Sequence, residues 1–164
     1  MDTTTVDELG KLAALAQAVA TLQSDDAFGP RLEAQDWQQL APFLSRSEIR
    51  AGDLLLRQDQ HERHCYFLER GNLQVFVTRS TPGTHRISVL RAGSIVGEAA
   101  LFGDIPRMAN VEAMSNCVVW TLTAKQFEEL ARRSPEVALK LAYGAAAVLA
   151  SRTRANLERA LPLS

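Results

Sequence analysis

Between residues 51 and 122 the apolar residues stop recurring every three or four positions, as in a helix, and gather into short runs typical of β-strands. The runs are rich in β-branched, aromatic and leucine residues and read DLLLR, CYFLER, LQVFVT, HRISVLR, RMANVEAM and CVVWTL. The dipeptide Gly71-Asn72 and the stretch STPGT at residues 80–84 favour tight turns between them. Short strands at such spacing predict a small antiparallel sandwich or barrel.

Helical spacing occupies the residues before this region. A capping box, Thr5-x-x-Glu8, opens a predicted helix over about residues 6–23. The apolar residues of this helix form one stripe: Val6, Leu9, Leu12, Leu15, Val19 and Leu22. The stripe either packs on its own domain or mediates dimerisation or docking of a partner. After the linker SDDAFGP at residues 24–30, a shorter helix is predicted over about residues 33–44, with an inner side made of Trp37, Leu40, Phe43 and Leu44.

Helical spacing returns after Thr121. Thr123 can cap a helix with the sequence AKQFEELARR, and Pro135 is suited to open a final helix that continues to about Arg159. At 1.5 Å per residue this helix would reach roughly 35 Å, which is too long to lie on one small barrel. One side of this helix carries a stripe of small and apolar residues: Val137, Leu141, Gly144, Val148, Ser151 and Ala155. We expect the first half of the stripe to pack in the core and the second half to form a homodimer seam.

The predicted fold class is therefore α+β and mainly β: an antiparallel β-roll or jelly-roll barrel flanked by N-terminal helices and a long C-terminal helix. Residues 1–30 are expected to form an N-terminal amphipathic helix and linker, and residues 31–164 the main domain. At 164 residues the chain is long enough to bury a core without disulfides or metals. Cys65 and Cys117 lie in apolar strand-like runs, where free cysteines behave as small buried hydrophobes.

The charge balance argues against two broad classes of partner. The chain has 18 basic and 19 acidic residues and a formal net charge of −1, so it has no general attraction to nucleic acid or to an anionic membrane surface. The N-terminal segment opens with acids and is too polar for a secretory signal, and no apolar run approaches the length of a membrane span. We therefore expect a cytoplasmic protein that binds any anion locally.

The stretch VGEAALFGDIPRMANV, residues 96–111, places one acid and one base among small apolar residues. EAALF can form a single helical turn whose first amides point outward without partners, and Ala99 and Ala100 are too small to keep a ligand from that backbone. Arg107 supplies a planar cation suited to two phosphate oxygens, while Glu98 would repel a phosphate but can accept a hydrogen bond from a sugar hydroxyl. This pattern predicts a site for a phosphorylated ribose; alternatively, Glu98 and Arg107 pair with each other across a turn.

At these residues the chain resembles the cyclic nucleotide-binding domain family, as found in the regulatory subunit of cAMP-dependent protein kinase and in the bacterial catabolite activator protein. The family's phosphate-binding cassette reads approximately Gly-Glu-x-Ala-Leu, a short linker, then Pro-Arg-x-Ala-x-Val, and here runs from Gly97 to Val111. AGDLLLRQDQ, YFLERGNLQVFV and ISVLRAGSIVGE resemble the family's opening strands, and FEELARRSPEVALKLA resembles its B and C helices. The resemblance covers about residues 32–160.

The resemblance implies a receptor for a cyclic nucleotide, with defined roles for the cassette residues. Glu98 would accept a hydrogen bond from the ribose 2′-hydroxyl, and Arg107 would pair with the cyclic phosphate. The backbone amides of Glu98, Ala99 and Ala109 would hold the phosphate oxygens. The remaining positions that the resemblance assigns to the pocket are Gly97, Ala100, Val75, Ile87 and Ser88.

Other positions bear on the choice of nucleotide. Met108 lies where cGMP-selective members of the family tend to carry a hydroxyl, so we expect cAMP to bind better than cGMP. Two adjacent residues of the C helix touch adenine in the catabolite activator protein, and they correspond here to Arg152 and Thr153. Thr153 is expected to contact the base and Arg152 to stack on it. Loop glycines of the family are replaced by Asp59, Gln60 and the stretch HERH.

The leading hypothesis is a stand-alone receptor without an output domain, cofactor or enzymatic activity, because the sequence shows no helix-turn-helix, kinase-inhibiting or catalytic signature. Ligand would order the cassette and move the C-terminal helix, which would signal to an unidentified downstream protein. The alternative is a ligand-free dimerisation or scaffold module with the same fold. A third hypothesis, a metal-dependent barrel enzyme, rests on His61, His64 and His85; however, HERHC without a clear acidic fourth ligand is a weak zinc site, and a polar loop is the stronger interpretation.

Overall fold

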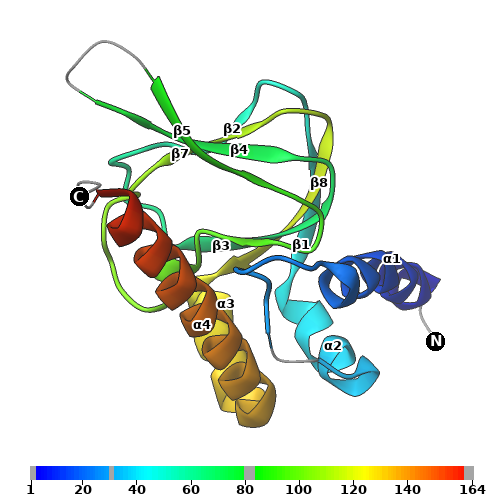
Figure 1. Cartoon of the computed structure of the whole chain (residues 1–164). Helices are drawn as coiled ribbons and strands as arrows, with labels where there is room; N and C mark the ends of the chain where they lie inside the picture. Colours follow the sequence, from blue (N-terminus) through cyan, green and yellow to red (C-terminus); the bar gives the residue numbers. More distant parts are fainter. Residues whose placement is uncertain (1–2, 30–31, 80–83, 161–164) are drawn as a thin grey trace.

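The computed structural model describes residues 3–29, 32–79 and 84–160, and two antiparallel sheets form a barrel at its centre (Figure 1). One sheet has the strand order β1-β8-β3-β6 and the other the order β2-β7-β4-β5. The strands are β1 (Ser45–Ile49), β2 (Leu54–Leu56), β3 (His64–Arg70), β4 (Leu73–Thr78), β5 (Thr84–Leu90), β6 (Ile95–Val96), β7 (Asn110–Ala113) and β8 (Cys117–Thr123). The predicted α+β, mainly β class is confirmed.

Strands β3 and β8 are mostly buried on both faces, because helices cover the outer face of their sheet. Side chains alternate along a strand. In β3, Cys65 and Phe67 therefore pack toward the helices, whereas Tyr66 and Leu68 pack into the barrel interior. The residues of β8 divide between the same two clusters. Burial on two sides explains why both strands read as continuous apolar runs rather than as alternating apolar and polar residues.

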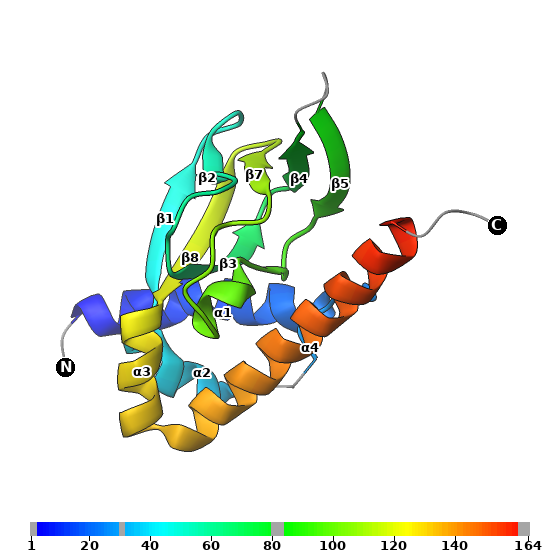
Figure 2. The same ribbon diagram turned by 90° about the vertical axis from the view of Figure 1, so that its left-hand side faces the viewer.

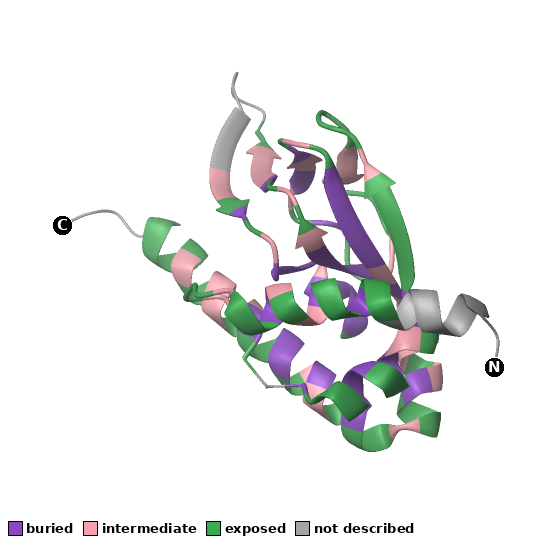
Figure 3. Ribbon diagram, turned by 90° about the vertical axis from the view of Figure 1, so that its right-hand side faces the viewer, coloured by how far each residue is buried: buried purple, intermediate pink, exposed green. Residues whose placement is uncertain are grey.

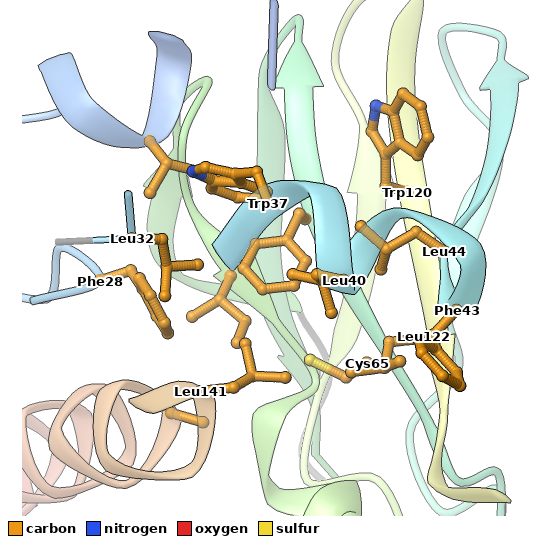
Figure 4. Packing of buried hydrophobic residues seen from close by; sticks show 14 of the residues in the cluster. Phe28, Leu32, Trp37, Leu40, Phe43, Leu44, Cys65, Trp120, Leu122 and Leu141 are labelled. Carbon is orange, nitrogen blue, oxygen red and sulfur yellow. The ribbon is translucent and has the colours of Figure 1, made fainter. Parts of the chain in front are cut away.

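The helices gather below this sheet (Figure 2). They are α1 (Thr3–Thr21), α2 (Ala34–Leu40), the 3-10 helix η1 (Ala41–Phe43), α3 (Ala124–Arg133) and α4 (Pro135–Ala160). Their inner sides are buried and their outer sides exposed (Figure 3). Leu12, Leu15 and Val19 of α1 belong to the same hydrophobic cluster as Trp37 of α2 and Phe67 of β3, part of which Figure 4 shows. At these positions α1 packs on its own domain, which was one of the two predicted alternatives.

Some helix ends differ from the prediction. Because α1 begins at Thr3, Thr5 lies inside the helix and does not cap it. The helix predicted over residues 33–44 is split into α2 and η1, since Pro42 has no backbone N–H to continue an α-helix. Thr123 caps α3 as predicted: its hydroxyl oxygen accepts a hydrogen bond from the backbone N–H of Gln126 at 3.1 Å.

One strand, β1, was missed by the sequence analysis. Strand β1 has the polar sequence SRSEI and is largely exposed at the edge of its sheet, where it pairs with β8. Backbone pairing rather than an apolar run places it there, so the spacing of apolar residues carries no signal. Strand β6 has two residues and pairs with β3; it lies in ISVLRAGSIVGE, the stretch that resembles the family's opening strands.

The long helix α4 has 26 residues and reaches past the barrel (Figure 2). Val137 and Leu141 are buried in the helix cluster, as predicted for the first half of the stripe, and Val148 of the second half is buried there as well. The second half does not face outward: Ser151 and Ala155 line a cavity of the same chain. The prediction that these residues form a dimer seam is therefore wrong. No helix in the described part of the chain, α4 included, combines the length and apolar character that crossing a membrane requires.

Candidate functional site

Strand β6 ends in a sharp turn that leads into the 3-10 helix η2 (Glu98–Leu101). At this turn Gly97 has a φ angle of +73°, in the left-handed region that glycine adopts without steric cost. A Cβ atom on this residue would lie 2.8 Å from Nη1 of Arg107 and 3.0 Å from the backbone oxygen of His64. Both the backbone angle and the close approach of Arg107 therefore require glycine here.

Arg107 is buried beside this turn, with 7% of its surface exposed. Its Nη1 donates to the backbone oxygen of Gly97 at 3.2 Å, and its Nη2 donates to the backbone oxygen of His64. The Nε atom is buried and has no hydrogen-bond partner among the described residues. Since buried polar groups in folded proteins are nearly always paired, a guanidinium with an unused N–H fits an anionic ligand.

The backbone of Arg107 is tied to the loop after β2. Its N–H donates to the backbone oxygen of Gln60 at 2.9 Å, and its own backbone oxygen accepts from the N–H of Asp59 at 2.8 Å. Asp59 has a φ angle of +68°, the left-handed conformation that glycine adopts most easily; Asp is one of the residues that tolerates it. The replaced loop glycines therefore leave the position of Arg107 intact.

Glu98 pairs with α4 rather than with the cassette arginine. Its side chain is 7% exposed, and its Oε2 accepts a hydrogen bond from Nη1 of Arg152 at 2.8 Å. The alternative that Glu98 and Arg107 pair across a turn is wrong, because Arg107 donates to backbone oxygens instead. A carboxylate can accept about four hydrogen bonds, so Glu98 can still accept one from a hydroxyl group.

Arg152 holds a second carboxylate as well. Its Nε donates to Oδ2 of Asp26 at 2.9 Å, and its Nη2 is buried with no partner among the described residues. Burial opposes the ionisation of Asp26, but the hydrogen bond and the positive charge of Arg152 outweigh it and lower the pKa of Asp26. Asp26 is therefore a carboxylate at neutral pH. Stacking of Arg152 on a purine stays a prediction.

These groups surround a cavity of about 510 Å³ between the barrel, η2 and the second half of α4, within the usual size range of small-molecule sites. Every residue that the sequence analysis assigned to ligand binding lines it: Val75, Ile87, Ser88, Gly97, Glu98, Ala99, Ala100, Arg107, Met108, Ala109, Arg152 and Thr153. Asp26, Asn156 and Arg159 also line the cavity and were missed, since they lie in a linker and on the end of a helix, where no local motif marks them.

Met108 and Thr153, which both line the cavity, differ in the hydrogen bonds that they can offer a ligand. Met108 is 65% exposed and offers a thioether but no hydroxyl group at the cavity. Thr153 donates its hydroxyl to the backbone oxygen of Leu149 at 2.8 Å, one turn earlier in α4. The Thr153 hydroxyl oxygen can still accept a hydrogen bond, for example from an exocyclic amine.

The histidines of HERH are paired with carboxylates outside this cavity. Nδ1 of His61 lies 3.3 Å from Oδ1 of Asp104, and Nδ1 of His64 lies 2.7 Å from Oε1 of Glu62. The side chain of His85 lies outside the described residues. Within the ranges that the structure describes, no three His, Cys, Asp or Glu side chains gather closely enough to hold a metal ion.

Cys65 and Cys117 are buried and are not joined in a disulfide, as predicted. Burial and the nearby charge of Glu98 raise the pKa of the Cys65 thiol well above its ordinary value. Cys65 is therefore a neutral packing residue of the helix cluster rather than a nucleophile.

Comparison with known proteins decides the family. Residues 46–134 match the model of the cyclic nucleotide-binding domain. The chain belongs to the cyclic nucleotide-binding domain family. The match contains the cassette from Gly97 to Val111, but Asp26 and Arg152 lie outside it. This member of the family therefore builds part of its cavity from residues beyond the matched domain.

Relatives and solved structures agree with this assignment. The cAMP-dependent protein kinase regulatory subunit of Debaryomyces hansenii is 34% identical over 99 residues, which are 60% of this chain and 21% of the relative. The chain spans about a fifth to a quarter of the length of the curated relatives it matches.

Among solved structures, a cyclic nucleotide-binding domain from Methylobacillus flagellatus has a TM-score of 0.79 at 16% identity, covering 92% of this chain and 83% of that one. The Thermus thermophilus catabolite activator protein has a TM-score of 0.68 at 26% identity, covering 82% of this chain and 61% of that one. The first likeness shows the fold alone.

Proposed function

We propose that this cyclic nucleotide-binding domain is a receptor for cAMP that signals through α4 and has no catalytic role. The observation that carries the proposal is the buried guanidinium of Arg107, whose Nε has no partner among the described residues and which borders a cavity of about 510 Å³. A buried cation attracts a phosphate strongly, because charges interact more strongly away from water, where the effective dielectric constant is low.

The rest of the cavity suits a cyclic nucleotide. The backbone amides of Glu98 and Ala99 begin η2, and with the amide of Ala109 they would hold phosphate oxygens. The Glu98 carboxylate, which lies in the same cavity, would accept from the ribose 2′-hydroxyl. Separate partners for the phosphate and the sugar make this arrangement specific for a nucleotide rather than for any anion.

Preference for cAMP over cGMP follows from Met108 and Thr153. Met108 has no hydroxyl to hydrogen-bond a guanine, so cGMP gains no polar side-chain contact at this position. The Thr153 hydroxyl oxygen can accept from the adenine amine. We expect cGMP to bind at least tenfold more weakly, which corresponds to about one unsatisfied hydrogen bond.

The route to a partner begins with α4. Arg152 and Ser151 of α4 are bonded to the cassette and to the linker before α2, so a ligand that changes the cassette also changes the position of the helix. We expect this movement to be read by a downstream protein. A cytoplasmic location stays a prediction.

We also propose a homodimer through the outer face of α4, in place of the stripe that the sequence analysis chose. Exposed residues that do not line the cavity recur there at spacings of four, three, four and seven, as in a two-helix seam: Leu139, Tyr143, Ala146, Ala150 and Leu157. The substitution Tyr143→Glu, remote from the cavity, should convert a dimer to a monomer in sedimentation analysis. A sedimentation profile unchanged by it would count against this seam.

Calorimetric titration with cAMP and cGMP tests the receptor. The wild-type chain should bind cAMP more tightly, and Arg107→Ala should weaken binding at least tenfold, because each hydrogen bond to a charged group contributes about 1.5 to 3 kcal/mol. No heat and no shift in melting temperature at millimolar cAMP would contradict the proposal. That result would favour the alternative, a dimerisation or scaffold module that keeps the fold without a ligand.

A further inference from the structure

The linker between α1 and α2 reaches α4 at two adjacent points. The hydroxyl of Ser151 donates to the backbone oxygen of Asp25 at 3.1 Å, and Nε of Arg152 donates to Oδ2 of Asp26 at 2.9 Å. The Asp26 carboxylate is itself held from the other side, since its Oδ1 accepts from the hydroxyl of Ser24 at 2.8 Å. A carboxylate fixed at both oxygens presents a defined anchor to Arg152.

Arg152 transmits this anchor to the cavity. Its guanidinium is planar and rigid, so the Nε bonded to Asp26 and the Nη1 bonded to Glu98 move together. The side chain of Glu98 is 7% exposed, and a buried carboxylate is costly unless a cation and hydrogen bonds compensate its charge. In the described part of the chain Arg152 is the cation that pairs with Glu98.

The orientation of the Glu98 carboxylate matters because one of its two oxygens is already bonded to Arg152. Oε2 accepts from Arg152 at 2.8 Å, which fixes the plane of the carboxylate and directs the other oxygen. If Arg152 loses its anchor on Asp26, the Glu98 carboxylate loses that fixed orientation as well. The Glu98 carboxylate would then have to be ordered when the ligand binds, and the conformational entropy lost would weaken the hydrogen bond to the ligand hydroxyl.

We propose that Asp26 is a positioning residue of the nucleotide site: through Arg152 it holds Glu98 in the orientation that accepts the ribose 2′-hydroxyl. The inference rests on the proposed function and adds the linker before α2 to the ligand site. Both Asp26 and Arg152 lie outside residues 46–134, the part of the chain that matches the family. The matched range therefore does not include the two residues that hold Glu98 from outside the cassette.

The proposal predicts that the effect of an Asp26 substitution on affinity depends on one ligand group, the ribose 2′-hydroxyl. Asp26→Asn should weaken binding of cAMP about fivefold, the upper end of what a partly exposed ion pair contributes, because Asp26 and Arg152 are 27% and 21% exposed. The same substitution should leave the affinity for 2′-deoxy-cAMP unchanged, since that ligand has no hydroxyl for Glu98. A general loss of structure would weaken both ligands alike.

Two controls isolate the route through Arg152. Asp25→Asn removes the same charge from the neighbouring residue, which also borders the cavity but is bonded to α4 through its backbone oxygen; it should change both affinities by the same factor and leave their ratio unchanged. In an Arg152→Met background, Asp26→Asn should have no further effect on either ligand, because the connection to Glu98 is already absent.

Calorimetric titration of these variants with cAMP and 2′-deoxy-cAMP is the test. The ratio of the two affinities, measured on one preparation, is insensitive to the fraction of folded protein. Equal weakening of both ligands by Asp26→Asn, an unchanged ratio, or a full effect in the Arg152→Met background would overturn the inference while leaving the receptor proposal standing. Failure of the wild-type chain to bind cAMP would overturn both.

Discussion

Gly97→Ala tests the central geometric claim about the cassette, that Arg107 takes its position because residue 97 has no side chain. The substitution has two separable costs. An L-residue with a φ angle of +73° is strained by about 1 to 2 kcal/mol. In addition, the new Cβ would lie 2.8 Å from Nη1 of Arg107, so the guanidinium must move away from the backbone oxygens of Gly97 and His64.

The second cost can be estimated from the bonds that are broken. Leaving a buried polar group unsatisfied costs about 1 to 3 kcal/mol, so Gly97→Ala should lower the free energy of unfolding by about 2 to 5 kcal/mol in total. Displacement of Arg107 from the cavity should also weaken cAMP binding at least tenfold, because a hydrogen bond to a charged group contributes about 1.5 to 3 kcal/mol.

Gly52→Ala is the matched control. Gly52 has a φ angle of +91°, but a Cβ there would meet no atom within 4 Å, so this variant carries the backbone strain alone. It should lose about 1 to 2 kcal/mol of stability and bind cAMP normally. Urea unfolding and calorimetric titration measure the two quantities. If Gly97→Ala resembled Gly52→Ala in both stability and affinity, the argument about Arg107 would be refuted.

Three further outcomes follow from particular contacts. Thr123→Ala should lower the free energy of unfolding by about 1 kcal/mol in urea titrations, because the backbone N–H of Gln126 loses its cap. Burial opposes ionisation of Asp36, yet its hydrogen bond from Lys140 at 2.9 Å lowers the pKa of Asp36; the pair should therefore stabilise the fold above the ordinary aspartate pKa of about 3.9. Asp36→Asn should accordingly destabilise the protein at pH 7, with the difference from wild type shrinking as pH falls through the lowered pKa. Because burial raises the pKa of Cys65, a thiol reagent should label it only as fast as the protein unfolds, and rapid labelling of the folded protein would contradict that burial.

The cassette could be predicted from the sequence because its chemistry is local. Gly97, Glu98 and Arg107 lie within one short stretch, and the turn, the small residues and the charges each leave a recognisable mark on it. The structure places all of them around one cavity. The barrel was predictable for a similar reason, since most of its strands are apolar runs with turns between them.

What escaped prediction has little local signal or depends on distant residues. The polar edge strand β1 is held by its pairing with β8, and no spacing of apolar residues reports it. The face that α4 turns toward the cavity was also assigned wrongly. Ser151 and Ala155 continue an apolar stripe in sequence, but the barrel beside them decides whether that stripe meets a cavity or a second chain.

The sequence by itself determined the class of fold and the cassette, because strand periodicity and an acid and a base close together among small residues are local properties. Only the tertiary structure decided the partner of Glu98. Arg152 is 54 residues away from Glu98 along the chain, and Asp26 is 126 residues away from Arg152. Ion pairs at such separations arise from how helices pack on the barrel, and packing depends on the whole core rather than on any one segment.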